Sequence, residues 1–141
     1  MSTKLPKNYR PSADEPFMNK KQQEYFRQKL LAWRDELLSD FEATLEQLGK
    51  AEQKAADYAD MASDEADRSL ALRSRDRDRK LITKIDEALE RFKSGTYGYC
   101  SDTGNPIGLA RLEARPTASM SIEAQEAHEN REQMNQRGGS F

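Results

Sequence analysis

Apolar side chains recur every three or four residues along the first half of the chain. Between Lys20 and Ala56 there is no proline, and the only glycine is Gly49. The apolar positions of this stretch are Phe26, Leu30, Trp33, Leu37, Phe41, Leu45 and Leu48. Such spacing places one apolar stripe along an otherwise polar α-helix. We therefore predict a long helix from residue 20 to about residue 56, with Asn19 as its N-cap.

A second apolar stripe with the same spacing follows downstream. Its members are Leu70, Leu81, Ile82, Ile85, Leu89 and Phe92, and Gly95 is expected to end the helix. The stretch Asp57–Glu65 between the stripes is short, and a short connection makes consecutive helices antiparallel neighbours. An antiparallel coiled-coil hairpin is predicted over residues 20–94, with its tip at 57–65. A coiled coil between two chains is the alternative, but a turn at the tip favours a hairpin in a monomer.

The remaining segments have a different character. Residues 1–19 contain three prolines, so we expect an extended N-terminal arm, pinned by Tyr9 and Phe17. Residues 97–108 are rich in aromatic and turn residues, which predicts a small irregular or β-ribbon unit. Ser119 or Ser121 can cap a last helix ending near Gln136. The fold class is thus mainly α: a hairpin, a small globular domain over 95–136 with a C-terminal helix, and a flexible tail at 137–141.

Composition supports an elongated helical protein. Hydrophobic residues make up 35% of the chain and charged residues 34%, with a mean hydropathy of -1.01, which is too polar for one large core. The formal net charge of -2 gives no overall attraction to DNA or to an anionic membrane. Neither a membrane-spanning run nor the apolar core of a signal peptide is present, and Cys100 is the only cysteine. We expect a soluble, cytoplasmic protein without a disulfide framework.

Acidic residues concentrate at the predicted tip. Between Asp57 and Asp67 the chain has five acids and no base. Asp64, Glu65 and Asp67 are explained by helix capping and by the dipole of the second helix. Asp57 and Asp60 lie earlier, at the apex, where carboxylates suit a metal-bound or cationic site in another molecule.

Basic residues follow at once, over Arg73–Lys80, where the apolar stripe lapses. This segment has five bases and two acids. It is either a solvated helix face with charge pairs four residues apart, or a basic surface for an acidic protein or for phosphates. Catalysis has little support, because Cys100 and His128 are the only cysteine and histidine and no glycine-rich phosphate loop is present. We predict a binding protein and not an enzyme.

Four motifs together resemble the DksA family (DksA/TraR). Asp57–Ser63 matches its D-x-x-D-x-A tip, and Leu72–Ile82 resembles its second hairpin helix. Gly95–Cys100 looks like the entry to its zinc-finger domain, and Arg111–Thr117 matches its strongest signature. The resemblance covers nearly all of residues 20–136, and its motifs occur in the right order.

The resemblance implies a bacterial transcription regulator of the stringent response that binds RNA polymerase directly, without sequence-specific DNA contacts. Members of the family insert the coiled coil through the secondary channel of the polymerase. They destabilise open promoter complexes, notably at ribosomal RNA promoters, together with the alarmone ppGpp. A transcript-cleavage factor of the Gre type, which also carries acids on a coiled-coil tip, is the alternative.

Residue roles follow from the resemblance by position. Asp57, Asp60 and Ala62 match the tip residues that act near the polymerase active site. Arg77 and Leu81 match positions at the polymerase interface, and Leu81 also borders the ppGpp site. Lys84 and Arg115 match ppGpp-binding positions. Gln125 stands where the family has a further lysine at that site, so one phosphate-binding charge is missing.

This chain differs from the family at the positions of the zinc ligands. The family's two C-x2-C pairs fall on Cys100, Thr103, Ser121 and Ala124. A structural zinc site needs four Cys or His ligands, and one thiolate cannot supply them. We therefore predict a zinc-finger-like domain without zinc, held by hydrogen bonds from Thr103 and Ser121. The side chains expected to pack in place of the metal are Tyr97, Tyr99, Ile107, Leu109 and Ile122.

Overall fold

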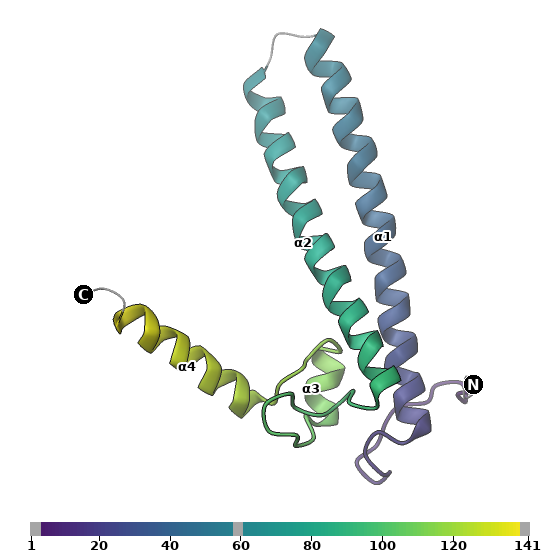
Figure 1. Cartoon of the computed structure of the whole chain (residues 1–141). Coiled ribbons are helices and arrows are strands. Elements are labelled where there is room, and N and C mark those ends of the chain that lie inside the picture. Colours follow the sequence, from purple (N-terminus) through teal and green to yellow (C-terminus); the bar gives the residue numbers. More distant parts are fainter. Residues whose placement is uncertain (1–3, 58–60, 139–141) are drawn as a thin grey trace. The chain divides into compact units, whose positions relative to one another are not determined.

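The computed structural model describes residues 4–57 and 61–138. Over these residues the chain forms four helices: α1 (Lys20–Asp57), α2 (Met61–Ser94), α3 (Leu109–Ala114) and α4 (Ile122–Gly138) (Figure 1). Within that part of the chain β-structure is limited to an isolated bridge between Tyr99 and Pro106. The mainly helical fold class is confirmed.

The chain divides into two compact units. We call Met1–Leu30 with Ala88–Phe141 the terminal unit, and Leu31–Glu87 the hairpin unit. None of the helices described is long and apolar enough to cross a membrane.

The ends of the helices lie close to where the sequence predicts them. The Asn19 side-chain oxygen accepts a hydrogen bond from the backbone N–H of Gln22 at 2.8 Å, which caps α1. Gly95 ends α2 with a φ of 75°, a left-handed conformation that glycine adopts without strain. The backbone N–H of Ala124 donates to the Ser121 hydroxyl at 3.2 Å, so Ser121 caps α4.

In the hairpin unit α1 and α2 run antiparallel, side by side (Figure 1). Leu37 is 7% exposed and Ile85 is completely buried, and the Arg34 Nε lies 2.7 Å from a carboxylate oxygen of Asp86 across the two helices. Because α2 begins at Met61, residues 61–65 of the predicted tip belong to a helix. Residues 58–60 lie outside the described part of the chain.

Two members of the predicted apolar stripes are exposed. Leu45 is 40% exposed and Leu70 is 63% exposed, so their assignment to the interface was wrong. Between residues 71 and 78 the side of α2 that is at least partly buried carries small or polar residues. They are Ala71, Ser74, Arg75 and Asp78. Over these residues α2 therefore offers α1 little apolar surface.

The terminal unit has a denser core built on aromatic rings. Phe26 is fully buried and Tyr97 is 3% exposed, with ring centroids 6.0 Å apart. Phe92 stacks on Tyr97 with a centroid distance of 4.0 Å. The Tyr97 hydroxyl donates a buried hydrogen bond to the carbonyl of Pro116 at 2.7 Å.

The N-terminal arm is pinned to this unit through the two aromatic residues that the sequence singles out. The ring of Tyr9 meets that of Tyr25 of α1 edge-on at 6.2 Å between centroids, and Phe17 meets the ring of Tyr99 edge-on at 5.6 Å. Met18 packs against Gly98, where an added Cβ would lie 2.7 Å from the Met18 Cγ. Gly98 has a φ of 90°, so this close approach requires glycine.

Candidate functional site

A cationic face runs along the outside of α2 in the hairpin unit. Its four bases, three or four residues apart and all exposed, are Arg73, Arg77, Lys80 and Lys84. Together with Asp76 and Leu81 they line a shallow groove of about 420 Å³. The structure therefore places the predicted Arg77, Leu81 and Lys84 on a single face of one helix. Arg73 and Lys80 extend that face and had no role in the sequence interpretation.

Among the described residues no ion pair involves the four bases of this face, and Asp76, the acid that lines the groove with them, pairs instead with Arg79. Asp76 lies 3.8 Å from Arg79, with both side chains more than half exposed. Ion pairs of this kind contribute little in water. Four side-chain cations on one helix face therefore remain available to an anionic partner.

Two of the predicted tip residues lie at the ends of the long helices. Asp57 is the last residue of α1 and Ala62 the second residue of α2, and their side chains are not described. Asp60 lies outside the described residues. Whether the side chains of Asp57, Asp60 and Ala62 form an exposed tip therefore stays a prediction.

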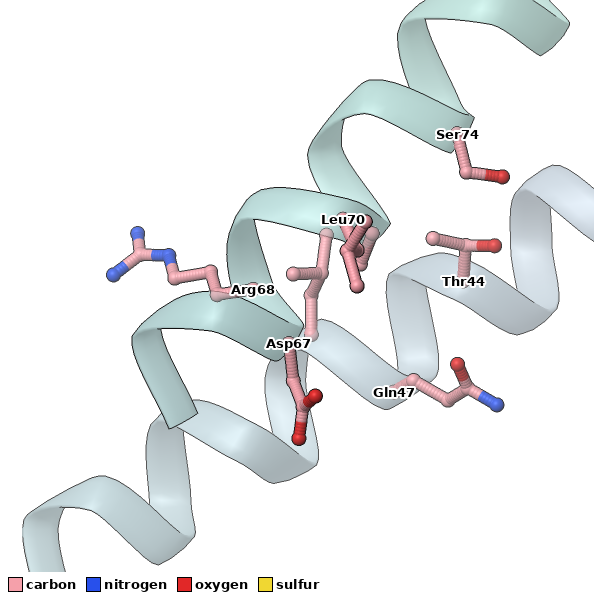
Figure 2. Close-up of a pocket in the computed structure, with 8 residues that line it drawn as sticks. Thr44, Gln47, Asp67, Arg68, Leu70 and Ser74 are labelled. Carbon is pink, nitrogen blue, oxygen red and sulfur yellow. The ribbon is translucent and has the colours of Figure 1, made fainter. Parts of the chain in front are cut away.

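A second groove lies between α1 and α2 and was not expected from the sequence. It has a volume of about 480 Å³. Its lining residues are Thr44, Gln47, Leu48, Asp67, Arg68, Leu70, Ala71 and Ser74. Figure 2 shows side chains from both helices around this space, with Arg68 pointing away from it. The groove forms where the apolar stripe of α2 lapses.

The signature stretch at 111–117 contains the short helix α3, which the sequence interpretation did not place. Leu112 is completely buried, and Arg111 donates through Nε to the carbonyl of Met120 at 2.8 Å. The burial of Leu112 and the hydrogen bond of Arg111 hold the helix in place. Arg115 directly follows the helix and has an exposed side chain. Alternation of apolar and charged residues over six positions is too short a pattern to predict a helix.

Glu113 ties α3 to α1 inside the terminal unit. Its carboxylate lies 2.7 Å from the Lys29 Nζ and 3.2 Å from the Tyr25 hydroxyl. Burial raises the pKa of Glu113, but the hydrogen bonds from Lys29 and Tyr25 and the charge of Lys29 outweigh it, so the pKa lies below its usual value. Sequence reasoning missed this contact because the partners are 84 and 88 residues apart.

The four positions that correspond to the family's zinc ligands do come together in part. The Ser121 hydroxyl donates to the Cys100 Sγ at 3.8 Å, and Thr103 also hydrogen-bonds the thiol through its side chain. Ala124 is 7% exposed and contributes a methyl group to the same region. The predicted hydrogen bond of Ser121 is confirmed, and the role of Thr103 in place of a metal ligand stays a prediction.

The packing predicted around these positions is confirmed in part. Tyr97 and Ile107 are buried, and Tyr99 and Leu109 are half-buried. Ile122 is 52% exposed, so its assignment to the packing was wrong. The residue begins α4, directly after the capping residue Ser121.

Hydrogen bonding makes Cys100 unusually acidic. The thiol is 3% exposed, and burial alone would raise its pKa. The Thr103 side chain and the backbone N–H groups of Ser121, Thr103 and Asp102 outweigh burial and lower the pKa to about 6. The sulfur is therefore surrounded by hydrogen-bond donors of its own chain.

These residues do not fit a structural zinc ion. Tetrahedral zinc takes four Cys or His ligands, whereas this cluster offers one sulfur, two hydroxyls and a methyl group. Over the described ranges, 4–57 and 61–138, no three His, Cys, Asp or Glu side chains gather in a metal-binding arrangement. We derive no role for zinc here.

Comparison with known proteins supports the resemblance. The family model of the DnaK suppressor protein DksA, N-terminal domain, matches residues 22–92. The model of the prokaryotic dksA/traR C4-type zinc finger matches residues 95–130. This chain belongs to the DksA family.

Individual relatives agree with this assignment over nearly the whole chain. An RNA polymerase-binding transcription factor DksA of Caulobacter vibrioides is 63% identical over 127 residues, which are 90% of this chain and 89% of the relative. The protein of the same name in Escherichia coli K12 is 40% identical over 124 residues, 88% of this chain and 82% of the relative.

The fold has a solved counterpart as well. The structure of transcription factor DksA2 from Pseudomonas aeruginosa aligns with a TM-score of 0.78 at 47% identity. The alignment covers 87% of this chain and 93% of that one. The DksA fold is thus present here although three of the four zinc-ligand positions carry other residues.

Proposed function

We propose that this chain is a transcription regulator that binds RNA polymerase and not an enzyme. The observation that carries the proposal is its membership of the DksA family, with relatives named RNA polymerase-binding transcription factors that align over about nine-tenths of the chain. The exposed cationic face of α2 supports the proposal, because four cations on one helix suit an acidic protein surface.

We propose that the hairpin enters the secondary channel of the polymerase and brings Asp57, Asp60 and Ala62 near the catalytic centre. Arg77 and Leu81, on the cationic face of α2, would then contact the polymerase. The expected consequence is a shorter lifetime of open complexes, notably at ribosomal RNA promoters. Binding is expected without sequence-specific DNA contacts and with the protein as a monomer in the cytoplasm.

Replacement of one tip carboxylate tests this mechanism. Asp60→Asn should keep binding to polymerase and abolish inhibition of a ribosomal RNA promoter in transcription with purified components. Glu65→Gln, at an exposed position of α2, is the matched control and should inhibit as well as the unmodified protein. Normal inhibition by Asp60→Asn would contradict the proposed role of the tip.

A cleavage assay on backtracked complexes separates this function from that of a Gre-type factor. A Gre-type factor would hold a second metal ion at the polymerase active site and accelerate hydrolysis of the transcript. We expect no acceleration. Rapid cleavage that depends on Asp57 or Asp60 would replace the proposal with the alternative.

We propose that ppGpp strengthens the effect through Lys84 and Arg115, each exposed in its own unit. Gln125 stands where the family has a further lysine, so the strengthening should be smaller than in relatives that keep the lysine. Lys84→Ala and Arg115→Ala should each remove the response to ppGpp while inhibition without ppGpp persists. Gln125→Lys should increase the response, and an unchanged response would argue against this site.

We also propose that the protein folds and acts without zinc. The supporting observation is the cluster around Cys100, in which hydroxyl and backbone donors occupy the sulfur. Metal analysis of the purified protein should find no stoichiometric zinc, and a chelator should leave its unfolding transition unchanged. The triple variant Thr103→Cys, Ser121→Cys and Ala124→Cys is the positive control and should bind about one zinc per chain. One zinc per chain in the unmodified protein would overturn the proposal.

A further inference from the structure

An acidic residue occupies a core position of the helical hairpin. Along α2 the buried or half-buried positions Ser74, Asp78, Leu81 and Ile85 follow the coiled-coil spacing of three and four, with half-buried Leu81 at the border of the cationic face. Asp78 is 6% exposed, and α1 is the other helix of the hairpin unit. Its burial therefore places Asp78 in the interface between the two helices.

The carboxylate of Asp78 has no partner that would offset its burial. Among the described residues, no hydrogen bond or ion pair involves Asp78, although several arginines lie near it in sequence. The described residues also contain no fully buried side-chain oxygen without a hydrogen bond. The Asp78 oxygens must therefore reach water at the edge of the interface.

Beyond Asp78, toward the junction of the two helices, burial among the described side chains is limited to Leu48, which is 9% exposed. The Arg75 guanidinium lies over the ring of Phe41 at 4.8 Å from its centroid, where a coiled coil would place an apolar side chain. Further along, the groove of about 480 Å³ separates the helices, and Leu70 at its rim is 63% exposed (Figure 2). On the other side of Asp78, toward the C-terminal end of α2, Ile85 is fully buried and Asp86 binds Arg34 at 2.7 Å.

We propose that Asp78 marks the boundary of a weakly paired segment, which we call the distal segment and which comprises residues 41–48 of α1 and 70–78 of α2. A carboxylate that is 6% exposed is only partly hydrated, which disfavours the closed state, and opening of the helices completes its hydration. The distal segment therefore opens locally while the remainder of the hairpin unit stays paired. The feature is a conformational device of the chain alone, and it holds whether or not the partner is RNA polymerase.

Hydrogen exchange of the full chain, followed by mass spectrometry, measures such opening directly. In the unmodified protein, amides of the distal segment should exchange faster than those around Ile85. Asp78→Leu should slow exchange of the distal segment at least about tenfold, because an apolar side chain in place of a buried charge is stabilising. Exchange of the terminal unit should not change.

Asp76 supplies the matched control. It lies two residues away on the same helix, with a side chain that is 66% exposed. Asp76→Leu removes the same charge and changes helix propensity by the same amount, so it should alter exchange of the distal segment by no more than about twofold. A difference between the two variants therefore reports on burial and not on propensity.

An isosteric pair removes the effect of the added apolar surface. Asp78→Asn should slow exchange of the distal segment several-fold, and Asp76→Asn should leave it unchanged, with the mass of each variant checked by light scattering. Equal effects of substitution at 76 and 78 would overturn the proposal. Faster exchange in both Asp78 variants, or slowing of the whole chain to the same extent, would overturn it as well.

Discussion

The terminal unit and the hairpin unit are held together in different ways, although both use parts of α1 and α2. In the terminal unit, Phe26, Leu30 and Leu112 are completely buried. Among the described residues of the hairpin unit, Ile85 is the one large side chain that is completely buried. The first unit thus has a core, whereas the second has a narrow interface.

The polar contacts differ in the same direction. The terminal unit has a buried hydrogen bond from Tyr97 to Pro116 and a half-buried ion pair between Lys29 and Glu113. The hairpin unit presents Arg73, Arg77, Lys80 and Lys84 to solvent and places Asp78 inside. The terminal unit, in which three of the four zinc-ligand positions carry other residues, is stabilised by buried side chains and buried polar contacts. The hairpin unit is packed less tightly and exposes its charges to solvent.

Truncation of one aromatic ring in each unit should have the largest effect and tests the comparison directly. Phe26→Ala removes a fully buried ring and should lower the free energy of unfolding by about 3–5 kcal/mol. Phe41→Ala removes a half-buried ring beside Arg75 and should cost less than half as much. Urea unfolding followed by circular dichroism measures both values. Equal losses would show that the two units are packed alike.

Addition of one methyl group to a glycine of each unit should give effects of opposite sign. Gly98→Ala should destabilise by about 1–3 kcal/mol, because its Cβ would lie 2.7 Å from Met18 at a positive φ. Gly49 lies inside α1 with no atom within 4 Å of an added Cβ, so Gly49→Ala should stabilise by about 0.5–1 kcal/mol. Thermal unfolding of the two variants is the measurement. Destabilisation by Gly49→Ala would contradict the open packing of the hairpin.

Much of this fold could be predicted because its main signals are local. The apolar spacing predicted both long helices, and Asn19, Gly95 and Ser121 marked helix ends through their own backbone chemistry. Periodicity was wrong where burial depends on the facing helix. Leu45 and Leu70 keep the helical spacing but are exposed, in a part of the hairpin where the buried side of α2 carries small or polar residues.

The candidate sites were predictable to a smaller extent. Arg77, Leu81 and Lys84 share a helix face because residues three and four apart are neighbours on a helix. The ion pair of Glu113 with Lys29 joins distant parts of the chain, and no local pattern encodes it. The hydroxyl donors around Cys100 came from the family's spacing of zinc ligands, since Thr103 and Ser121 alone would resemble ordinary turn residues.

Acidification should weaken the ion pair of the terminal unit, with the smallest of the expected effects. The pKa of Glu113 is lower in the folded chain than its unfolded value of about 4.3, so the folded state binds the proton more weakly. The stabilisation is therefore complete above about pH 4.3 and is lost as the pH falls through the lowered pKa. Because the side chain is 37% exposed, solvent screening should limit the contribution to under about 1 kcal/mol. The urea midpoints of the unmodified protein and of Glu113→Gln should differ at pH 7 and converge in acid. Glu42→Gln, at an exposed position of the hairpin unit, is the control, and the difference between its midpoint and that of the unmodified protein should show no such convergence. A difference for Glu113→Gln that does not change with pH would mean that the carboxylate acts through packing and not through its charge.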